Sequence, residues 1–168
     1  MVVVKSIIVF ISIAVLSAIS FVLVGFCAPV ENTTELSQSF QCSSQLLWSE
    51  LTDFSSYPEY KEGIDRVELL DTKGKRGWIE YDNIGTAREV VILKENPGKE
   101  LTVKMIDADS DIERIRTYSI YGDAKTSVLS ISESSRVEPL LLRSTMAISG
   151  RGLGLKKEVQ SLRQHLNS

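Results

Sequence analysis

The spacing of hydrophobic and polar positions changes three times along this chain. Residues 6–26 form a predominantly apolar run without a charged residue or a proline. Residues 45–53 place apolar side chains at helical spacing, residues 66–134 tend to alternate apolar and polar side chains, and helical spacing returns after Pro139. The pattern therefore predicts an apolar N-terminal helix, a short helix, a series of strands and a long final helix.

The apolar run is long enough to cross a membrane. Its 21 residues would form a helix about 31 Å long, close to the ~30 Å hydrocarbon core of a bilayer. A cleaved secretory signal usually has an apolar region of only about 7–15 residues and small residues before the cut, whereas here Phe26 and Pro29 flank the candidate cleavage position. We expect an uncleaved single-pass anchor at residues 6–26; a cleaved signal and lipidation at Cys27 are the alternatives.

Charge sets the expected orientation and excludes one class of partner. Lys5 is the only charged residue before Glu31, so the positive-inside rule places the N-terminus in the cytoplasm and the rest of the protein on the extracytoplasmic side. The chain beyond Lys5 carries 18 basic and 22 acidic side chains, a balance that argues against nucleic-acid binding.

We expect an anchor at 1–27, a tether at 28–35 and one ligand-binding domain at 36–168. The oligomeric state is not indicated.

The domain is expected to begin with a strand over residues 36–42, followed by a short helix. Ser43 or Ser44 would cap this helix, and Pro58 breaks the turn after it. The helix has its apolar face at Leu46, Leu47, Trp48 and Leu51. Further strands are predicted at 66–69, 78–84, 88–93, 101–105, 114–121 and 126–134, separated by turns rich in Gly, Pro and Asp.

The last segment predicts a long helix that starts at Pro139. Gly150, Gly152 and Gly154 interrupt it at about 1 kcal/mol each relative to alanine, which indicates a kink or a close approach to the sheet. Its apolar stripe consists of Leu142, Met146, Leu153, Leu155, Val159, Leu162 and Leu166. The order of elements predicts an α+β domain in which a curved antiparallel sheet wraps around this helix and leaves a cavity.

Residues 47–60, LWSELTDFSSYPEY, carry a family resemblance. With the segments at 116–120, 126–128 and 138–141, they resemble the START-like (SRPBCC) superfamily of helix-grip domains, which includes polyketide cyclase/dehydrase and lipid-transport proteins. The resemblance covers residues 36–166 and implies a helix-grip fold with an internal cavity for a hydrophobic ligand. It does not specify an activity, because such domains include binders, carriers, cyclases and a few hydrolases.

Five residues are candidates for the cavity wall on the expected sheet and final helix: Trp78, Met105, Tyr118, Met146 and Gly150. Each could equally belong to an ordinary core, since core and wall differ only in whether a void exists. Charged strand residues could also face the cavity or could face water, namely Glu80, Arg88, Glu89 and Arg116. A carboxylate facing an apolar cavity would have a raised pKa and could serve as an acid or base.

The residues of common catalytic and metal sites are scarce. His165 is the only histidine and lies near the end of the chain, and the two cysteines, Cys27 and Cys42, are far apart in sequence. We therefore expect neither a catalytic triad nor a metal site, and no cofactor. The sequence favours membrane-anchored binding of a hydrophobic small molecule or lipid without catalysis. The alternatives are a cyclase, dehydrase or hydrolase acting in the same cavity, and a scaffold without a ligand that contacts a membrane partner.

Overall fold

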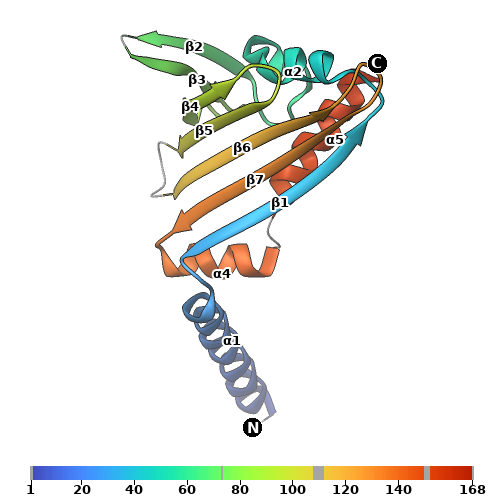
Figure 1. Cartoon of the computed structure of the whole chain (residues 1–168). Coiled ribbons are helices and arrows are strands. Elements are labelled where there is room, and N and C mark those ends of the chain that lie inside the picture. The colour runs from blue at the N-terminus through green and yellow to red at the C-terminus, as the bar shows by residue number, and fades with distance from the viewer. Residues whose placement is uncertain (1, 73, 108–111, 150–151, 168) are drawn as a thin grey trace. The chain divides into compact units, whose positions relative to one another are not determined.

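The computed structural model describes residues 2–72, 74–107, 112–149 and 152–167 (Figure 1). The chain divides into two compact units. Unit 1 consists of Met1–Glu31 and Val137–Arg151, and unit 2 consists of Asn32–Arg136 and Gly152–Ser168.

Unit 2 is built on a seven-stranded sheet with the order β1-β7-β6-β5-β4-β3-β2. The strands are β1 (Glu31–Phe40), β2 (Arg66–Thr72), β3 (Lys75–Tyr81), β4 (Ala87–Asn96), β5 (Glu100–Asp107), β6 (Ile112–Gly122) and β7 (Ser127–Val137). The sheet is antiparallel, as the sequence predicts. β1 begins at Glu31, before the predicted start at Leu36, so most of the segment expected as a tether is strand.

The alternation along β5 fixes which face of the sheet is the inner one. Leu101, Val103 and Met105 are buried, whereas the residues between them are partly exposed. Met105 pairs with Val90 on β4 and with Arg114 on β6. Because side chains alternate across a strand and directly paired residues share a face, this register carries one inner surface from strand to strand.

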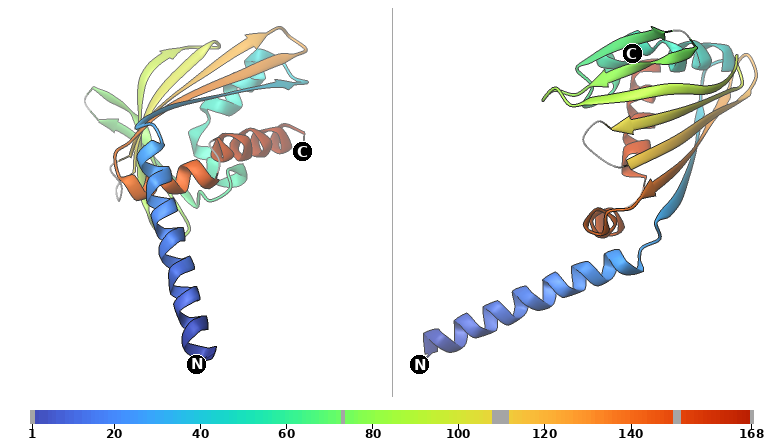
Figure 2. Two further views of the ribbon diagram at one scale, coloured as in Figure 1. Left: turned by 90° about the horizontal axis from the view of Figure 1, so that it is seen from below. Right: turned by 90° about the vertical axis from the view of Figure 1, so that its left-hand side faces the viewer.

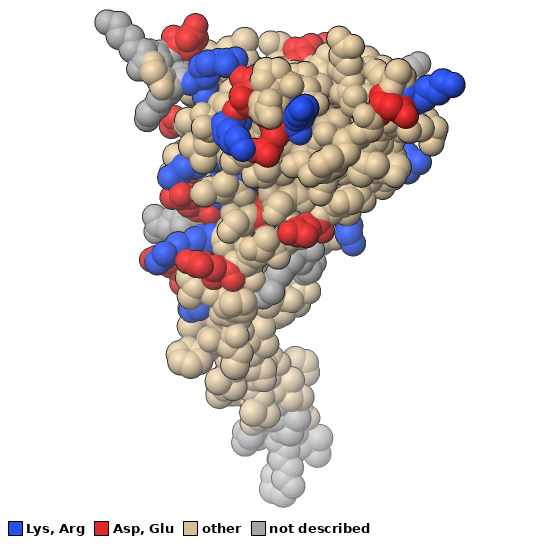
Figure 3. Space-filling model, in the orientation of Figure 1, with Lys and Arg blue, Asp and Glu red and all other residues tan. Residues whose placement is uncertain are grey.

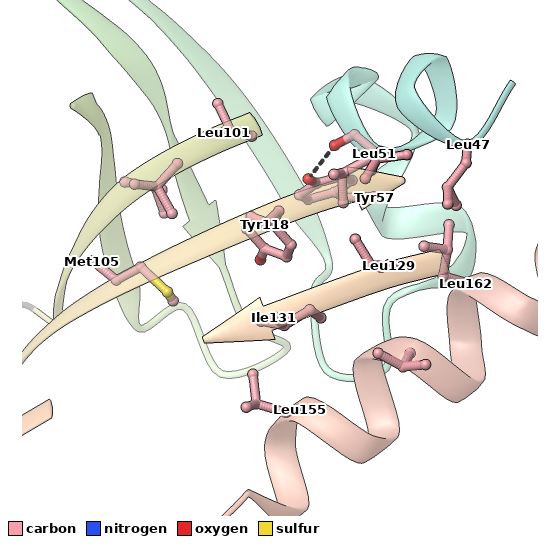
Figure 4. Close-up of a cluster of buried hydrophobic side chains, with 14 of the residues drawn as sticks. Leu47, Leu51, Tyr57, Leu101, Met105, Tyr118, Leu129, Ile131, Leu155 and Leu162 are labelled. Atoms are coloured by element: carbon pink, nitrogen blue, oxygen red, sulfur yellow. Dashed lines mark hydrogen bonds between the residues drawn. The ribbon is translucent and has the colours of Figure 1, made fainter. Parts of the chain in front are cut away.

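The short helices after β1 lie on the inner face. They are α2 (Ser44–Thr52), the 3-10 turn η1 (Phe54–Ser56) and α3 (Tyr57–Tyr60). The hydroxyl of Ser43 accepts a hydrogen bond from the Leu46 backbone N–H at 3.1 Å and caps α2. The buried Tyr57 hydroxyl donates to the Leu51 carbonyl at 2.7 Å (Figure 4) and so ties α3 back to α2.

Helix α5 (Leu153–Leu166) covers the same face (Figures 1 and 2). Leu155, Val159 and Leu162 are buried on it and pack in one core cluster with Leu129 and Ile131 of β7 (Figure 4). The predicted helix-grip arrangement, an antiparallel sheet with a C-terminal helix against it, is confirmed.

Unit 1 contains α1 (Val2–Cys27) and α4 (Leu140–Ser149), which pack against each other. The part of α1 over Phe10–Cys27 is long and apolar enough to cross a membrane, as a signal sequence near an N-terminus would also be. In Figure 3 the described part of this helix presents no charged side chain.

The prediction of one long helix from Pro139 is wrong. The segment forms α4 and α5, which belong to different units. Gly152 has φ +81°, a left-handed conformation that an α-helix cannot contain, and it caps the N-terminus of α5. A Cβ there would lie 2.8 Å from Thr34 Cγ2, so lack of a side chain is required as well.

Candidate ligand-binding site

Unit 2 encloses a cavity of about 380 Å³ between the inner face of the sheet and α5. This volume lies within the roughly 300–1,000 Å³ typical of small-molecule sites. Strands β3 to β6 supply one wall, α5 supplies another, and the chain after α3 completes the lining. The apolar part of the wall includes Trp78, Val90, Val103 and Met105.

A second part of the wall is charged, and the strand register explains its position. Glu80 on β3 pairs with Arg88 on β4, and Arg88 pairs in turn with Asp107 on β5. Val103 pairs with Arg116 on β6. Glu80, Arg88 and Asp107 each lie two residues from an apolar wall residue on the same strand, so they share the inner face. Arg116 shares it because it is directly paired with Val103. The charged part of the lining consists of Lys61, Glu62, Glu80, Asp82, Arg88, Asp107, Arg114, Arg116, Lys157 and Glu158, with Tyr118 beside them.

Arg116 is the centre of the charged wall. Its guanidinium is buried, forms ion pairs with Glu133 on β7 and Glu158 on α5, and donates to the Tyr118 hydroxyl at 3.0 Å. The Tyr118 hydroxyl in turn donates to Glu158 Oε1 at 2.8 Å. These contacts join the neighbouring strands β6 and β7 to helix α5.

The ion pairs continue from Glu158 along the wall. Lys61 Nζ lies 3.2 Å from Glu158 Oε1 and 3.8 Å from Glu80 Oε1. Arg88 contacts Glu80 at 3.6 Å and Asp107 at 2.5 Å, and Arg114 contacts Asp107 at 2.6 Å. Together with Arg116 and Glu133, this "charged chain" contains four cations and four anions in alternating contact. The set is therefore locally neutral.

The charges in the centre of this network are held in fixed protonation states. Burial alone would raise the pKa of Glu158, but Arg116 and then Lys61 outweigh it and hold the pKa at about 2. Burial opposes the charge of Arg116, yet Glu158 and the other neighbours raise its pKa well above the ordinary value. Burial also raises the pKa of Tyr118. At neutral pH Glu158 is thus a carboxylate, Arg116 a guanidinium and Tyr118 a neutral phenol.

An aromatic cluster holds the apolar wall. The rings of Phe54 and Trp78 stack with centroids 3.8 Å apart, and Tyr57 meets Trp78 edge-on at 5.9 Å. Trp78 Nε1 donates to Glu80 Oε1 at 3.1 Å, and Lys61 Nζ lies 3.6 Å from the Tyr57 ring centroid. The motif of residues 47–60 thus holds both the apolar and the charged wall in place.

The residues predicted from the sequence divide into three groups. Trp78, Met105 and Tyr118 line the cavity, and their role in ligand binding stays a prediction. Met146 lies on α4 in unit 1 and is not among the described residues that line the cavity, because the helix that carries it ends before α5 begins. Gly150 lies outside the described residues.

The charged candidates also separate. Glu80, Arg88 and Arg116 line the cavity, whereas Glu89, between Arg88 and Val90 on β4, is not among the described lining residues. Seven members of the charged wall were not among the candidates from the sequence: Lys61, Glu62, Asp82, Asp107, Arg114, Lys157 and Glu158. One signal was present for Glu158, because Gly154, Lys157, Glu158 and Ser161 form a polar line at helical spacing beside the buried stripe of α5.

Comparison with known proteins places the fold. No family model matches the chain, and no curated protein matches it in sequence. A START superfamily protein from Mycobacterium smegmatis is similar with a TM-score of 0.66 at 14% identity, covering 80% of this chain and 97% of that chain. The Zhui aromatase/cyclase from a Streptomyces species gives a TM-score of 0.68 at 10% identity, covering 80% and 93%.

A third similar structure is norcoclaurine synthase from Thalictrum flavum in complex with dopamine and hydroxybenzaldehyde. Its TM-score is 0.62 at 11% identity, and the match covers 86% of this chain and 90% of that chain. The chain therefore has the START-like helix-grip fold, as its sequence resemblance implies. These similar proteins include enzymes. Sequence identities this low support a shared fold but not a shared activity.

Proposed function

We propose that this protein reversibly binds a small molecule in the unit 2 cavity, without converting it, while α1 holds it in a membrane. The observation that carries the proposal is the division of the cavity wall. Trp78, Val90, Val103 and Met105 offer an apolar surface, and the charged chain offers donors and acceptors beside it. A ligand with an apolar body and a hydrogen-bonding group matches both parts. Because the charged chain is balanced, this ligand needs no net charge.

The protonation states favour binding over acid–base catalysis. A general acid or base works best when its pKa is near the operating pH. Glu158, with a pKa of about 2, is a weak base at neutral pH, and the raised pKa of Tyr118 makes that phenol a weak acid. Both groups can still accept or donate hydrogen bonds to a ligand. The second candidate function is conversion of the ligand, because an aromatase/cyclase and a synthase have this fold. The tests below distinguish conversion from binding.

We expect the purified full chain to retain a small molecule. Native mass spectrometry of the detergent-solubilised protein should detect an adduct, and solvent extraction should release it. Ser161 lines the cavity from α5, so Ser161→Trp is expected to fill the space and lower occupancy several-fold. Gln160 neighbours it on the exposed side of α5, and Gln160→Trp should leave occupancy unchanged. Equal occupancy in the two variants would place the compound outside this cavity.

We also expect α1 to remain in the mature protein. Its retention is supported by its contact with α4, in which the Ser144 hydroxyl donates to the Phe21 carbonyl at 2.7 Å. Alkaline carbonate extraction should leave the protein in the membrane pellet. N-terminal sequencing of this protein should show that the mature chain starts before residue 6. Soluble protein with a new N-terminus near residues 27–30 would instead identify a cleaved signal.

A further inference from the structure

Helix α4 combines an outward apolar surface with a tight contact to α1. Leu141 and Ile148 are 62% and 63% exposed, although both are large aliphatic residues. The same helix buries Ser144 completely. Packing within unit 1 leaves these aliphatic side chains exposed, although α1 beside them is also apolar. Their exposure therefore requires another explanation.

The contact between the two helices is made by small and hydroxyl-bearing residues. Ser144 Oγ donates to the Phe21 carbonyl at 2.7 Å and lies 3.2 Å from the Leu140 carbonyl. A Cβ added to Gly25 would lie 2.2 Å from Ser144 Oγ and 2.4 Å from the Leu140 carbonyl oxygen. The backbones therefore approach at a distance that only glycine permits. Small residues and serine hydrogen bonds are typical of helix contacts within membranes.

The contact lies inside the apolar segment of α1. Phe21 and Gly25 both belong to Phe10–Cys27, the part able to cross a membrane. At about 1.5 Å per residue, Phe21 lies about 9 Å from the Cys27 end of this segment. Ile148 lies deeper, because it lines an apolar groove together with α1 residues from Ile13 to Val24. A membrane that contains this segment would therefore also contain much of α4.

We propose that α4 is embedded in the membrane beside α1, with Leu141 and Ile148 in contact with lipid acyl chains. The inference rests on the proposed anchoring by α1. A bilayer is favoured over a protein partner because the exposed Ile148 of α4 lines one groove with the strongly exposed Leu16 of α1, so the two helices present a shared apolar surface.

The hydroxyl side chains of Ser144 and Thr145 on α4 also suit a membrane. Besides the Ser144 bonds, Thr145 Oγ1 donates to the Leu141 carbonyl at 3.0 Å, so this hydroxyl needs no water. Arg143 Nη1 donates to the Ala28 carbonyl at 3.3 Å, just beyond the end of α1. A cation at a helix C-terminus is favourable, and this position places the guanidinium at the headgroup level, where long basic side chains extend toward water.

Site-directed spin labelling of the full chain tests the proposal. Nitroxides would be attached to single cysteines at Ile148, Leu141, Leu16 and Leu69, in a protein with Cys27→Ser and Cys42→Ser. The labelled proteins would be reconstituted into phosphatidylcholine–phosphatidylglycerol vesicles. Leu16 on α1 and Leu69 on β2 are 63% and 61% exposed, so they match the α4 positions in chemistry and exposure. Collision rates with oxygen and with a water-soluble nickel chelate then report lipid and water contact.

Leu16 and Ile148 are expected to collide with the nickel chelate several-fold less often than Leu69, and with oxygen more often. Leu141, nearer to Arg143, should show an intermediate depth. If the label at Leu16 contacts lipid while the labels at Ile148 and Leu141 have the collision rates of Leu69, the embedding of α4 is refuted and the anchoring by α1 stands. If Leu16 itself matches Leu69, the proposed anchor fails, and the embedding of α4 fails with it.

Discussion

Replacing Arg116 by leucine is expected to lower the free energy of unfolding by about 3–5 kcal/mol, the cost of breaking a buried ion pair from one side. Arg116→Leu removes the guanidinium that pairs with Glu133 and Glu158 and bonds the Tyr118 hydroxyl. Glu158 keeps Lys61 at 3.2 Å, but the buried carboxylates lose their main counter-charge. Denaturant unfolding of the full chain in detergent, followed by near-ultraviolet circular dichroism, measures the change.

An exposed pair supplies the matched control. Arg76 Nη1 lies 2.7 Å from Glu95 Oε2, and the Arg76 side chain is 70% exposed. Because water screens such a pair, Arg76→Leu should cost less than about 1 kcal/mol. Equal losses from the two substitutions would show that the charged chain does not hold unit 2 together.

The second large effect is a pH dependence that originates in Glu158. Its pKa falls from the ordinary 4.5 to about 2 in the folded protein, a difference that corresponds to about 3 kcal/mol. Because the folded-state pKa is the lower one, this contribution is fully present above pH 4.5. It is lost as the pH falls through about 2, where the folded protein also takes up the proton.

Glu158→Gln should therefore be less stable than the natural sequence by about 3 kcal/mol at pH 7, with the difference shrinking between pH 4.5 and about 2. Unfolding curves recorded across this range test the expectation. Glu62 also pairs with a lysine of α5, Lys157, at 3.2 Å, but both side chains are strongly exposed. Glu62→Gln should change stability at pH 7 by less than about 1 kcal/mol. A difference for Glu158→Gln that is constant with pH would contradict the pKa assigned to this carboxyl.

The sequence predicted most of the fold because its patterns are local. The cap at Ser43 and the alternation of Leu101, Val103 and Met105 each depend on neighbouring residues, and each is found where it was expected. Pro58, expected to break a turn, instead lies in the first turn of α3, where proline is tolerated. At Gly152 the sequence indicated a kink or a close approach to the sheet, but not the division into two separate helices. A stripe at helical spacing continues through it in the sequence. Its φ of +81° and the closeness of Thr34, whose Cγ2 would lie 2.8 Å from an added Cβ, are features of the tertiary structure.

The charged wall could be predicted only in part because alternation does not say which set of side chains faces inward. On β6, Ile115 is 38% exposed and Arg116 only 7%, the reverse of the usual hydrophobic order. Arg116 can be buried because Glu133 on β7 and Glu158 on α5 meet it there. That meeting is a property of the tertiary structure, and no spacing within one segment encodes it.

The function we propose is reversible binding in the unit 2 cavity, without conversion of the ligand. The most direct test returns the extracted compound to protein that has been stripped of it, and compares the mass and structure of the compound before and after incubation. We predict saturable one-to-one binding that Ser161→Trp weakens and Gln160→Trp does not, with the compound recovered unchanged. Absence of saturable binding, or recovery of a chemically altered compound, would refute reversible binding without conversion.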